Sequence, residues 1–116
     1  MFAVIYQSYI KSGRESDYQS AWRKIATYFV EERGALGSCL HRGESGLWVA
    51  YSRWPNRETR DASWPKDAEI CLDLPEDIQR AAVVLKDCLE SQLPEIAMEV
   101  VDDLLAQSVQ IKELES

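Results

Sequence analysis

The opening segment, residues 2–10, carries apolar or aromatic side chains on both of its faces, and this feature constrains the fold most. Its Val, Ile and Tyr content and the stop at Lys11-Ser12-Gly13 predict a strand. Side chains alternate along a strand, so one face would hold Phe2, Val4, Tyr6 and Ser8, and the other Ala3, Ile5, Gln7 and Tyr9. A strand of this kind has to be covered on both sides.

A long amphipathic helix is expected after this strand. Apolar residues recur at helical spacing over residues 18–29. Gly34 supplies the left-handed residue that commonly ends a helix. Two alternative capping boxes stand at its start, Ser12-x-x-Glu15 and Ser16-x-x-Gln19.

Two further strands are predicted at residues 36–42 and 47–53, because Gly43-Glu44-Ser45-Gly46 between them suits a hairpin loop. They should pair antiparallel. Residues 56–62 then form a short polar helix, which Trp64-Pro65 stops.

The second half of the chain predicts one more long helix and a last strand. Asp73 is the expected cap, Pro75 an early helical proline and Glu76 the third residue after the cap. Apolar residues continue at helical spacing over residues 78–89, and this helix should end before Pro94. Residues 95–101 alternate as a strand, whereas residues 102–116 form a tail without a clear period.

The order strand, helix, strand, strand, helix, strand predicts an α+β fold, the ferredoxin-like βαββαβ antiparallel sheet, with two helices on one face. The chain should be one domain, residues 1–116, with its core in residues 2–101. The second sheet face would expose Ile5, Tyr9, Val49 and Tyr51. An apolar face of this kind predicts a partner, most simply a second copy of the chain, so we expect a homodimer.

Charge, cysteine content and hydropathy indicate which partners and which cellular compartment to expect. Thirteen basic and twenty acidic residues give a net charge of −7, which argues against nucleic acid as a partner. Cys39, Cys71 and Cys88 form no CxxC motif and leave one thiol over after any pairing, which fits reduced thiols in a cytoplasmic protein. No segment approaches the roughly 20 apolar residues that span a bilayer, so no membrane is expected.

Cofactor and metal motifs are missing from the sequence. It has no GxGxxG, no GxxxxGK[ST] and no GxSxG. No His or Cys pair stands at metal-ligand spacing. We therefore predict no metal and no cofactor.

The chain resembles the antibiotic biosynthesis monooxygenase family of dimeric α+β barrel proteins. The resemblance covers about residues 2–101 and includes the opening strand and the interval from Trp54 to Trp64 across the short helix. Two more segments within this range contribute to the resemblance: Glu31-Glu32-Arg33-Gly34-Ala35-Leu36-Gly37-Ser38 and Tyr51-Ser52-Arg53-Trp54-Pro55. It implies that two sheets meet in a barrel and that each subunit holds a small-molecule pocket between its sheet and helices.

Haem degradation, which one branch of that family performs, is not expected here. That branch uses an Asn on the first strand, a Trp after the short helix and a His some ten residues further on. The corresponding residues are Tyr6, Trp64 and Leu74, so only the Trp matches. The sole histidine, His41, lies on the second predicted strand and offers no evident axial ligand for haem iron.

Aromatic residues and one histidine supply the candidate site. A cofactor-independent monooxygenase has to bind a phenol or quinol, deprotonate it and stabilise the anion while it passes an electron to oxygen. In this reading Tyr6 and His41 are catalytic, and Tyr6, Trp54 and Trp64 bind a small aromatic substrate. The alternatives are that these rings fill the core, and that the protein is a non-catalytic dimeric small-ligand-binding or stress-related protein of the same fold.

Overall fold

Strand β1 (Phe2–Ile10) lies at the centre of an antiparallel sheet and pairs along both of its edges. The structure, a computed structural model, describes residues 1–64 and 73–105. One edge of β1 pairs with β3, and the other edge pairs first with β5 and then with β4, while β2 pairs with the outer edge of β3. The α+β, ferredoxin-like fold class is therefore confirmed.

The remaining elements follow β1 in the predicted order, with one added strand. They are α1 (Glu15–Glu32), β2 (Gly37–Arg42), β3 (Trp48–Trp54), α2 (Arg57–Ser63), α3 (Glu76–Asp87), β4 (Leu89–Gln92) and β5 (Ile96–Glu99). The hairpin of β2 and β3 is antiparallel, as predicted.

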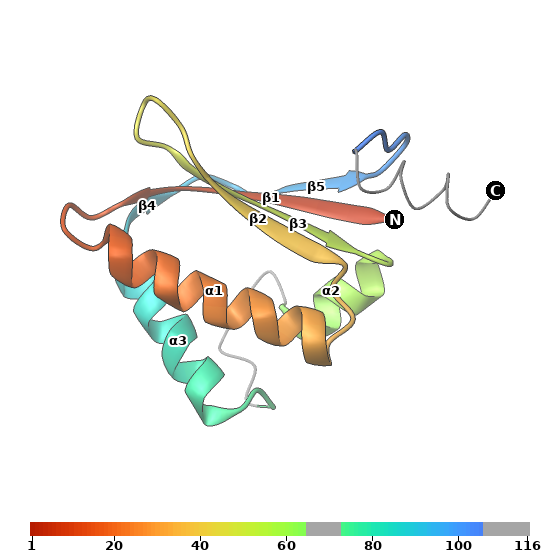
Figure 1. Cartoon of the computed structure of the whole chain (residues 1–116), viewed down its shortest axis with the longest axis horizontal. Coiled ribbons are helices and arrows are strands. Elements are labelled where there is room, and N and C mark those ends of the chain that lie inside the picture. The colour runs from red at the N-terminus through yellow and green to blue at the C-terminus, as the bar shows by residue number, and fades with distance from the viewer. Residues whose placement is uncertain (65–72, 106–116) are drawn as a thin grey trace.

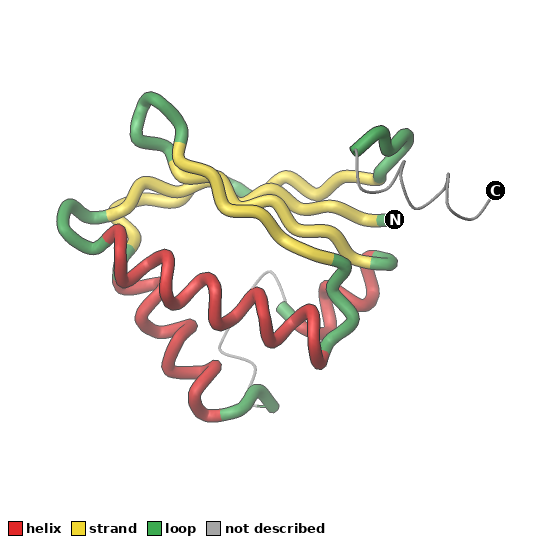
Figure 2. The backbone as a smooth tube through the Cα atoms, viewed as in Figure 1, coloured by secondary structure: helices red, strands yellow, loops and turns green. Residues whose placement is uncertain are grey.

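The three helices of the described residues lie on one face of the sheet, with α1 and α3 side by side and α2 near one end (Figure 1). Figure 2 shows the resulting two layers, strands above and helices below. The larger core cluster joins β1, α1 and α3 through Phe2, Val4, Ala21, Ile25, Phe29, Ile78, Ala81 and Ala82. Apolar burial between the layers thus holds the helices to the sheet.

The second long helix ends before Pro94, as predicted, but the helical spacing over residues 78–89 extends past its observed end and wrongly includes Cys88 and Leu89. Helix α3 ends at Asp87, and Leu89–Gln92 forms β4 against Ser8, Tyr9 and Ile10. The peptide N–H of Lys11 donates to the Cys88 carbonyl at 2.8 Å, which continues this pairing. The backbone groups along this edge of β1 need partners, and that tertiary demand overrides the helical periodicity.

Neither predicted capping box starts α1. The N-cap residue is Arg14, whose side chain makes no cap hydrogen bond, because the turn that leaves β1 closes one residue before the helix. Ser16 lies inside the helix. The Arg14 guanidinium instead bonds Asp17 and Asp87, at 3.0 and 3.1 Å, and so links α1 to the end of α3.

The expected Asp73 cap of the second long helix is also wrong. The N-cap position of α3 is Pro75, and the peptide N–H groups of Ile78 and Gln79 donate to its carbonyl. Asp73 pairs with Arg33 at 3.1 Å instead. The cap of the short helix is a side chain: the Asn56 Oδ1 accepts from the Thr59 N–H at 2.9 Å.

The second sheet face has no helix over it in the described part of the chain (Figure 1). Val49 and Tyr51 lie half-buried on it, and Tyr9 and Ile96 are 37% and 44% exposed. Arg53 crosses this face to bond Tyr51 and Asp103, so the segment after β5 is tied to it at one end.

Several sequence predictions fall outside the described residues. Cys71 and the tail from residue 106 onward belong to this group. Within residues 1–64 and 73–105, no helix is both long and apolar enough to cross a membrane.

Gly34 is the glycine whose conformation we expect to matter most for the fold. Its φ is +78°, and the peptide N–H groups of Arg33 and Ala35 both donate to the Phe29 carbonyl around it. A Cβ would meet only ordinary contact there, so Gly34→Ala should cost about 1 kcal/mol through the left-handed backbone alone. Gly34→Asn should cost less. Urea denaturation measures both, and equal losses would contradict this explanation.

Candidate functional site

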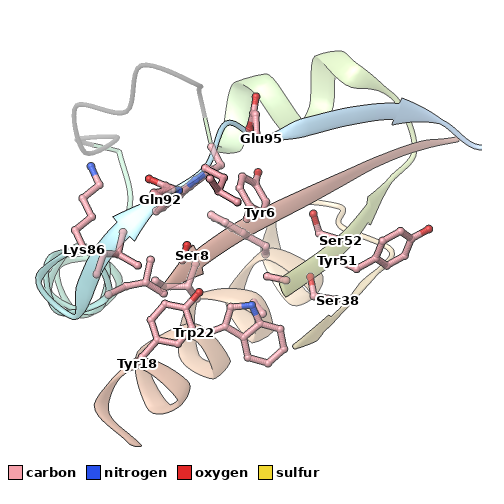
Figure 3. A pocket seen from close by; sticks show the side chains of 18 of the residues that line it. Tyr6, Ser8, Tyr18, Trp22, Ser38, Tyr51, Ser52, Lys86, Gln92 and Glu95 are labelled. Carbon is pink, nitrogen blue, oxygen red and sulfur yellow. The ribbon is translucent and has the colours of Figure 1, made fainter. Parts of the chain in front are cut away.

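A cavity of about 390 Å³ lies between the sheet and helices α1 and α3. Aromatic residues from β1, α1, β3 and the end of α2 line it, among them Tyr6, Tyr18, Trp22, Phe29, Trp54 and Trp64. Figure 3 shows Tyr6 and Ser8 on the strand above Tyr18 and Trp22 on the helix. The chamber has the size and the aromatic lining of a small-molecule site.

Small residues on the sheet create this cavity. Four of the residues of β1, β2 and β3 that face the helices and line the cavity are small: Ser8, Ser38, Ala50 and Ser52. Larger rings stand at the ends of the same stretch of β3, where Trp48 and Trp54 are 8% and 2% exposed. The space between the two tryptophans therefore stays open beneath α1.

A buried charged cluster closes one end of the cavity. Arg60 of α2 is 2% exposed and donates to both carboxylate oxygens of Glu95, at 3.0 and 3.3 Å. It also donates to the Tyr6 hydroxyl oxygen at 3.3 Å and to Asp61 at 2.8 Å. The ring of Phe2 lies 5.5 Å from the guanidinium carbon. Each charge in this cluster thus has a partner, as burial requires.

A break in the edge strand brings Glu95 into this cluster. Ile96 pairs with Ile5 and Gln92 pairs with Ser8, so three residues of one strand stand opposite two of β1. Pro94, which lacks a peptide N–H, lies in this irregular stretch, and the Leu93 N–H donates to the Gln7 carbonyl. The break lets Glu95 turn to the helix side, beside Tyr6 (Figure 3).

Burial and neighbouring charges fix the protonation of two groups here. Burial raises the pKa of Tyr6, and the hydrogen bond from Arg60 opposes that rise only in part. Burial by itself lowers the pKa of Arg60, but hydrogen bonds to Asp61, Tyr6 and Glu95 outweigh it and raise that pKa. At neutral pH the site therefore holds a neutral tyrosine hydroxyl and a charged guanidinium.

Two polar atoms beside the cavity have no hydrogen-bond partner among the described residues. They are the Ser52 hydroxyl oxygen and the Trp54 indole nitrogen, on residues that are 9% and 2% exposed and that both line the cavity. Unpaired buried polar atoms are rare and destabilising. Both atoms are themselves buried, so a ligand in the cavity would reach them only after the side chains around them shift.

The structure brings together three of the four sequence-predicted site residues. Tyr6, Trp54 and Trp64 line the cavity, and the Trp64 ring packs edge-on against Phe29 at 5.7 Å. His41 lies elsewhere, exposed on the sheet face opposite the helices, with its Nδ1 3.2 Å from the Val49 carbonyl. It does not reach the cavity.

Sequence reasoning missed Arg60, Glu95 and Ser52. Arg60 stands in a helix that reads as polar, and nothing in its spacing indicates burial. The signal for Glu95 is the proline before it, because a proline interrupts strand pairing and marks a place where a side chain changes direction. Ser52 shares a face with Trp54 on β3, so alternation alone indicates that it points inward.

No group of three or more possible metal ligands occurs in residues 1–64 and 73–105. The carboxylate nearest the cavity, Glu95, is engaged by Arg60. The described part of the site thus presents rings and hydrogen-bonding groups and not a ligand set for a metal.

Residues 1–63 match the model of the antibiotic biosynthesis monooxygenase family. This match spans more than half of the 116 residues, and the chain belongs to that family. A search of the curated proteins found no match.

Solved structures of the same fold are distant in sequence. SnoaB, a cofactor-independent oxygenase from Streptomyces nogalater, has a TM-score of 0.66 at 13% identity, over 89% of this chain and 95% of SnoaB. Rv0793 from Mycobacterium tuberculosis has a TM-score of 0.68 at 14% identity, over 90% and 98%. A third structure, of an antibiotic biosynthesis monooxygenase, has a TM-score of 0.66 at 20% identity, over 88% of this chain and 100% of that one. These identities establish a shared fold.

The raised pKa of Tyr6 predicts how stability depends on pH. A group whose pKa is higher in the folded state stabilises the fold below its unfolded value, here 10.0, and that contribution is lost as pH rises through the folded value. Tyr6→Phe should therefore lose less stability above pH 10 than the original chain. Urea denaturation across this range measures the difference, and identical pH slopes would contradict it.

Proposed function

We propose that this protein is a cofactor-independent monooxygenase that acts on a small flat phenol or quinol in the cavity. The observation that carries the proposal is the aromatic-lined cavity between the sheet and the helices, with Tyr6 at its wall. Rings give contact area to a flat ligand, and isolated polar groups orient it. Membership of the family and the fold shared with SnoaB support the same reaction class.

The chemistry needs only oxygen and the substrate. A deprotonated phenol passes one electron to O₂, and the two radicals combine at a ring carbon that carries hydrogen. The resulting peroxide anion takes up the proton that the phenol lost, and the hydroperoxide then loses water to give a quinone. One oxygen atom thus ends in the new carbonyl and the other in water. Tyr6 would donate to the phenolate oxygen, and Trp64 would cover the ring and exclude water.

A second candidate is a small-ligand-binding protein without turnover. The positions of the two possible general bases, His41 and Glu95, favour it. His41 lies on the opposite face of the sheet. Both oxygens of Glu95 accept hydrogen bonds from Arg60. A substrate for the oxygenase would accordingly have to ionise readily, with Tyr6 stabilising its anion.

Oxygen uptake distinguishes the two candidates. With a panel of naphthols and hydroxyanthracenes, we expect one O₂ consumed per quinone formed, at a rate unchanged by a metal chelator. Tyr6→Phe should slow turnover by about a hundredfold, because it removes a donor to the developing anion. His41→Ala is the matched comparison and should keep the rate. Binding of these compounds without oxygen uptake would favour the binding protein.

We also propose that the protein is a homodimer through the open sheet face, defined here by Ile5 and Tyr9 of β1, Val49 and Tyr51 of β3, and Ile96 of β5. These side chains are half-buried or exposed in the single chain. A second copy would remove this apolar surface from water.

Ile96→Glu tests the dimer with little risk to the fold, because Ile96 is 44% exposed in the single chain. A carboxylate there would be buried without a partner in the dimer and should dissociate it. Val83→Glu is the matched control, since Val83 is 52% exposed on α3, on the other side of the molecule. Sedimentation should give a dimer for the control and a monomer for Ile96→Glu; a monomer in both and in the original chain would overturn the proposal.

A further inference from the structure

The hydrogen bonds of Arg60 determine whether the Tyr6 hydroxyl group donates or accepts a hydrogen bond toward a ligand. Arginine has donors and no acceptor, so in the 3.3 Å contact the Tyr6 oxygen must accept. The hydroxyl proton is then left to point elsewhere. Within the described residues, the one hydrogen bond of the Tyr6 hydroxyl is the one that it accepts from Arg60.

The contacts around Arg60 hold its side chain in place, so the direction of its hydrogen bond to Tyr6 does not change. Its side chain is 2% exposed, is held by carboxylates on two sides and lies against the ring of Phe2. Its charge is compensated by Glu95 and Asp61, so it offers no unpaired positive charge to a ligand. Arg60 therefore acts on a ligand through the two residues that it holds and that line the cavity, Tyr6 and Glu95, and of these only Tyr6 has a proton to donate.

We propose that Arg60 is a positioning residue that fixes Tyr6 as a hydrogen-bond donor, so that the cavity selects flat aromatic compounds carrying an acceptor oxygen. The favoured class is aromatic ketones, quinones and phenolates. Compounds of the same shape with only a donor, or with no polar atom, bind less tightly. This inference rests on the proposed aromatic-binding function and adds its specificity.

Three tricyclic compounds of nearly equal shape separate the possibilities. Fluorenone carries an acceptor oxygen, carbazole carries an N–H donor, and fluorene carries neither. Equilibrium dialysis at fixed cosolvent gives each dissociation constant for the full chain. Fluorenone should bind roughly fivefold to tenfold more tightly than fluorene, the factor that one net hydrogen bond supplies.

Tyr6→Phe should abolish this preference while leaving the affinity for fluorene unchanged. Tyr28→Phe is the matched control, because the Tyr28 oxygen also accepts from an arginine, Arg33 at 3.4 Å, but does not line the cavity. The control should keep the original preference for fluorenone. A preference unchanged in Tyr6→Phe would overturn the proposal.

The role of Arg60 is tested by the double substitution Arg60→Met with Glu95→Gln, which removes the donor without leaving a buried carboxylate unpaired. Tyr6 could then rotate and accept, so the ratio of carbazole to fluorenone affinity should rise several-fold. A loss of affinity that is equal for all three compounds would show a merely structural role and overturn the proposal. If this variant does not fold, the comparison of Tyr6→Phe with Tyr28→Phe still decides whether Tyr6 donates.

Failure of this inference can be told apart from failure of the proposed function. Equal binding of all three compounds by the original chain would overturn the specificity and leave the aromatic site standing. Binding of none of them would overturn both.

Discussion

Small side chains on β3 leave the space between the sheet and helix α1 in which the candidate site lies, and the rest of the site depends on that space. Ala50 and Ser52 face the helices where a larger residue would fill the layer. Interiors of proteins are otherwise close-packed, so an open cavity needs small side chains on one side and large, well-packed side chains around it. Trp48 and Trp54 provide walls on the same strand. A pocket of this kind is already formed before any ligand arrives.

The ion pair of Arg60 with Glu95 joins two parts of the chain that are 35 residues apart. It ties the short helix α2 to the edge of the sheet at the place where the edge strand breaks. Burying two charges is unfavourable unless each is fully hydrogen-bonded, and here Tyr6 and Asp61 complete the set. The same contacts that make the burial tolerable also give Tyr6 its direction, so structural and functional demands coincide in one cluster.

The two faces of β1 have different roles. Val4 and Tyr6 point toward the helices and belong to the core and the cavity, respectively. Ile5 points to the open face, where the described part of the chain covers it only in part. An apolar face on a central strand is stable only when something lies over it, and this is the reason for our proposal that two copies of the sheet pair through this face.

Local pattern was sufficient for most of the fold. Alternation in β1, helical spacing in α1 and the glycines of the hairpin report interactions between residues close in sequence, and these elements are confirmed. Strand β4 could not be predicted in this way, because its residues continue a helical pattern and become a strand only against β1.

The residues of the candidate site also fall into those that local pattern predicts and those that it does not. The sequence by itself placed Tyr6 on the helix side of the first strand and Trp64 beside the short helix, since face and proximity follow from local geometry. Only the tertiary structure decided that Arg60 is buried, that Glu95 turns inward and that His41 lies on the far side of the sheet. The physical reason is that burial and ion pairing depend on which distant segments meet, and no short-range period encodes that meeting.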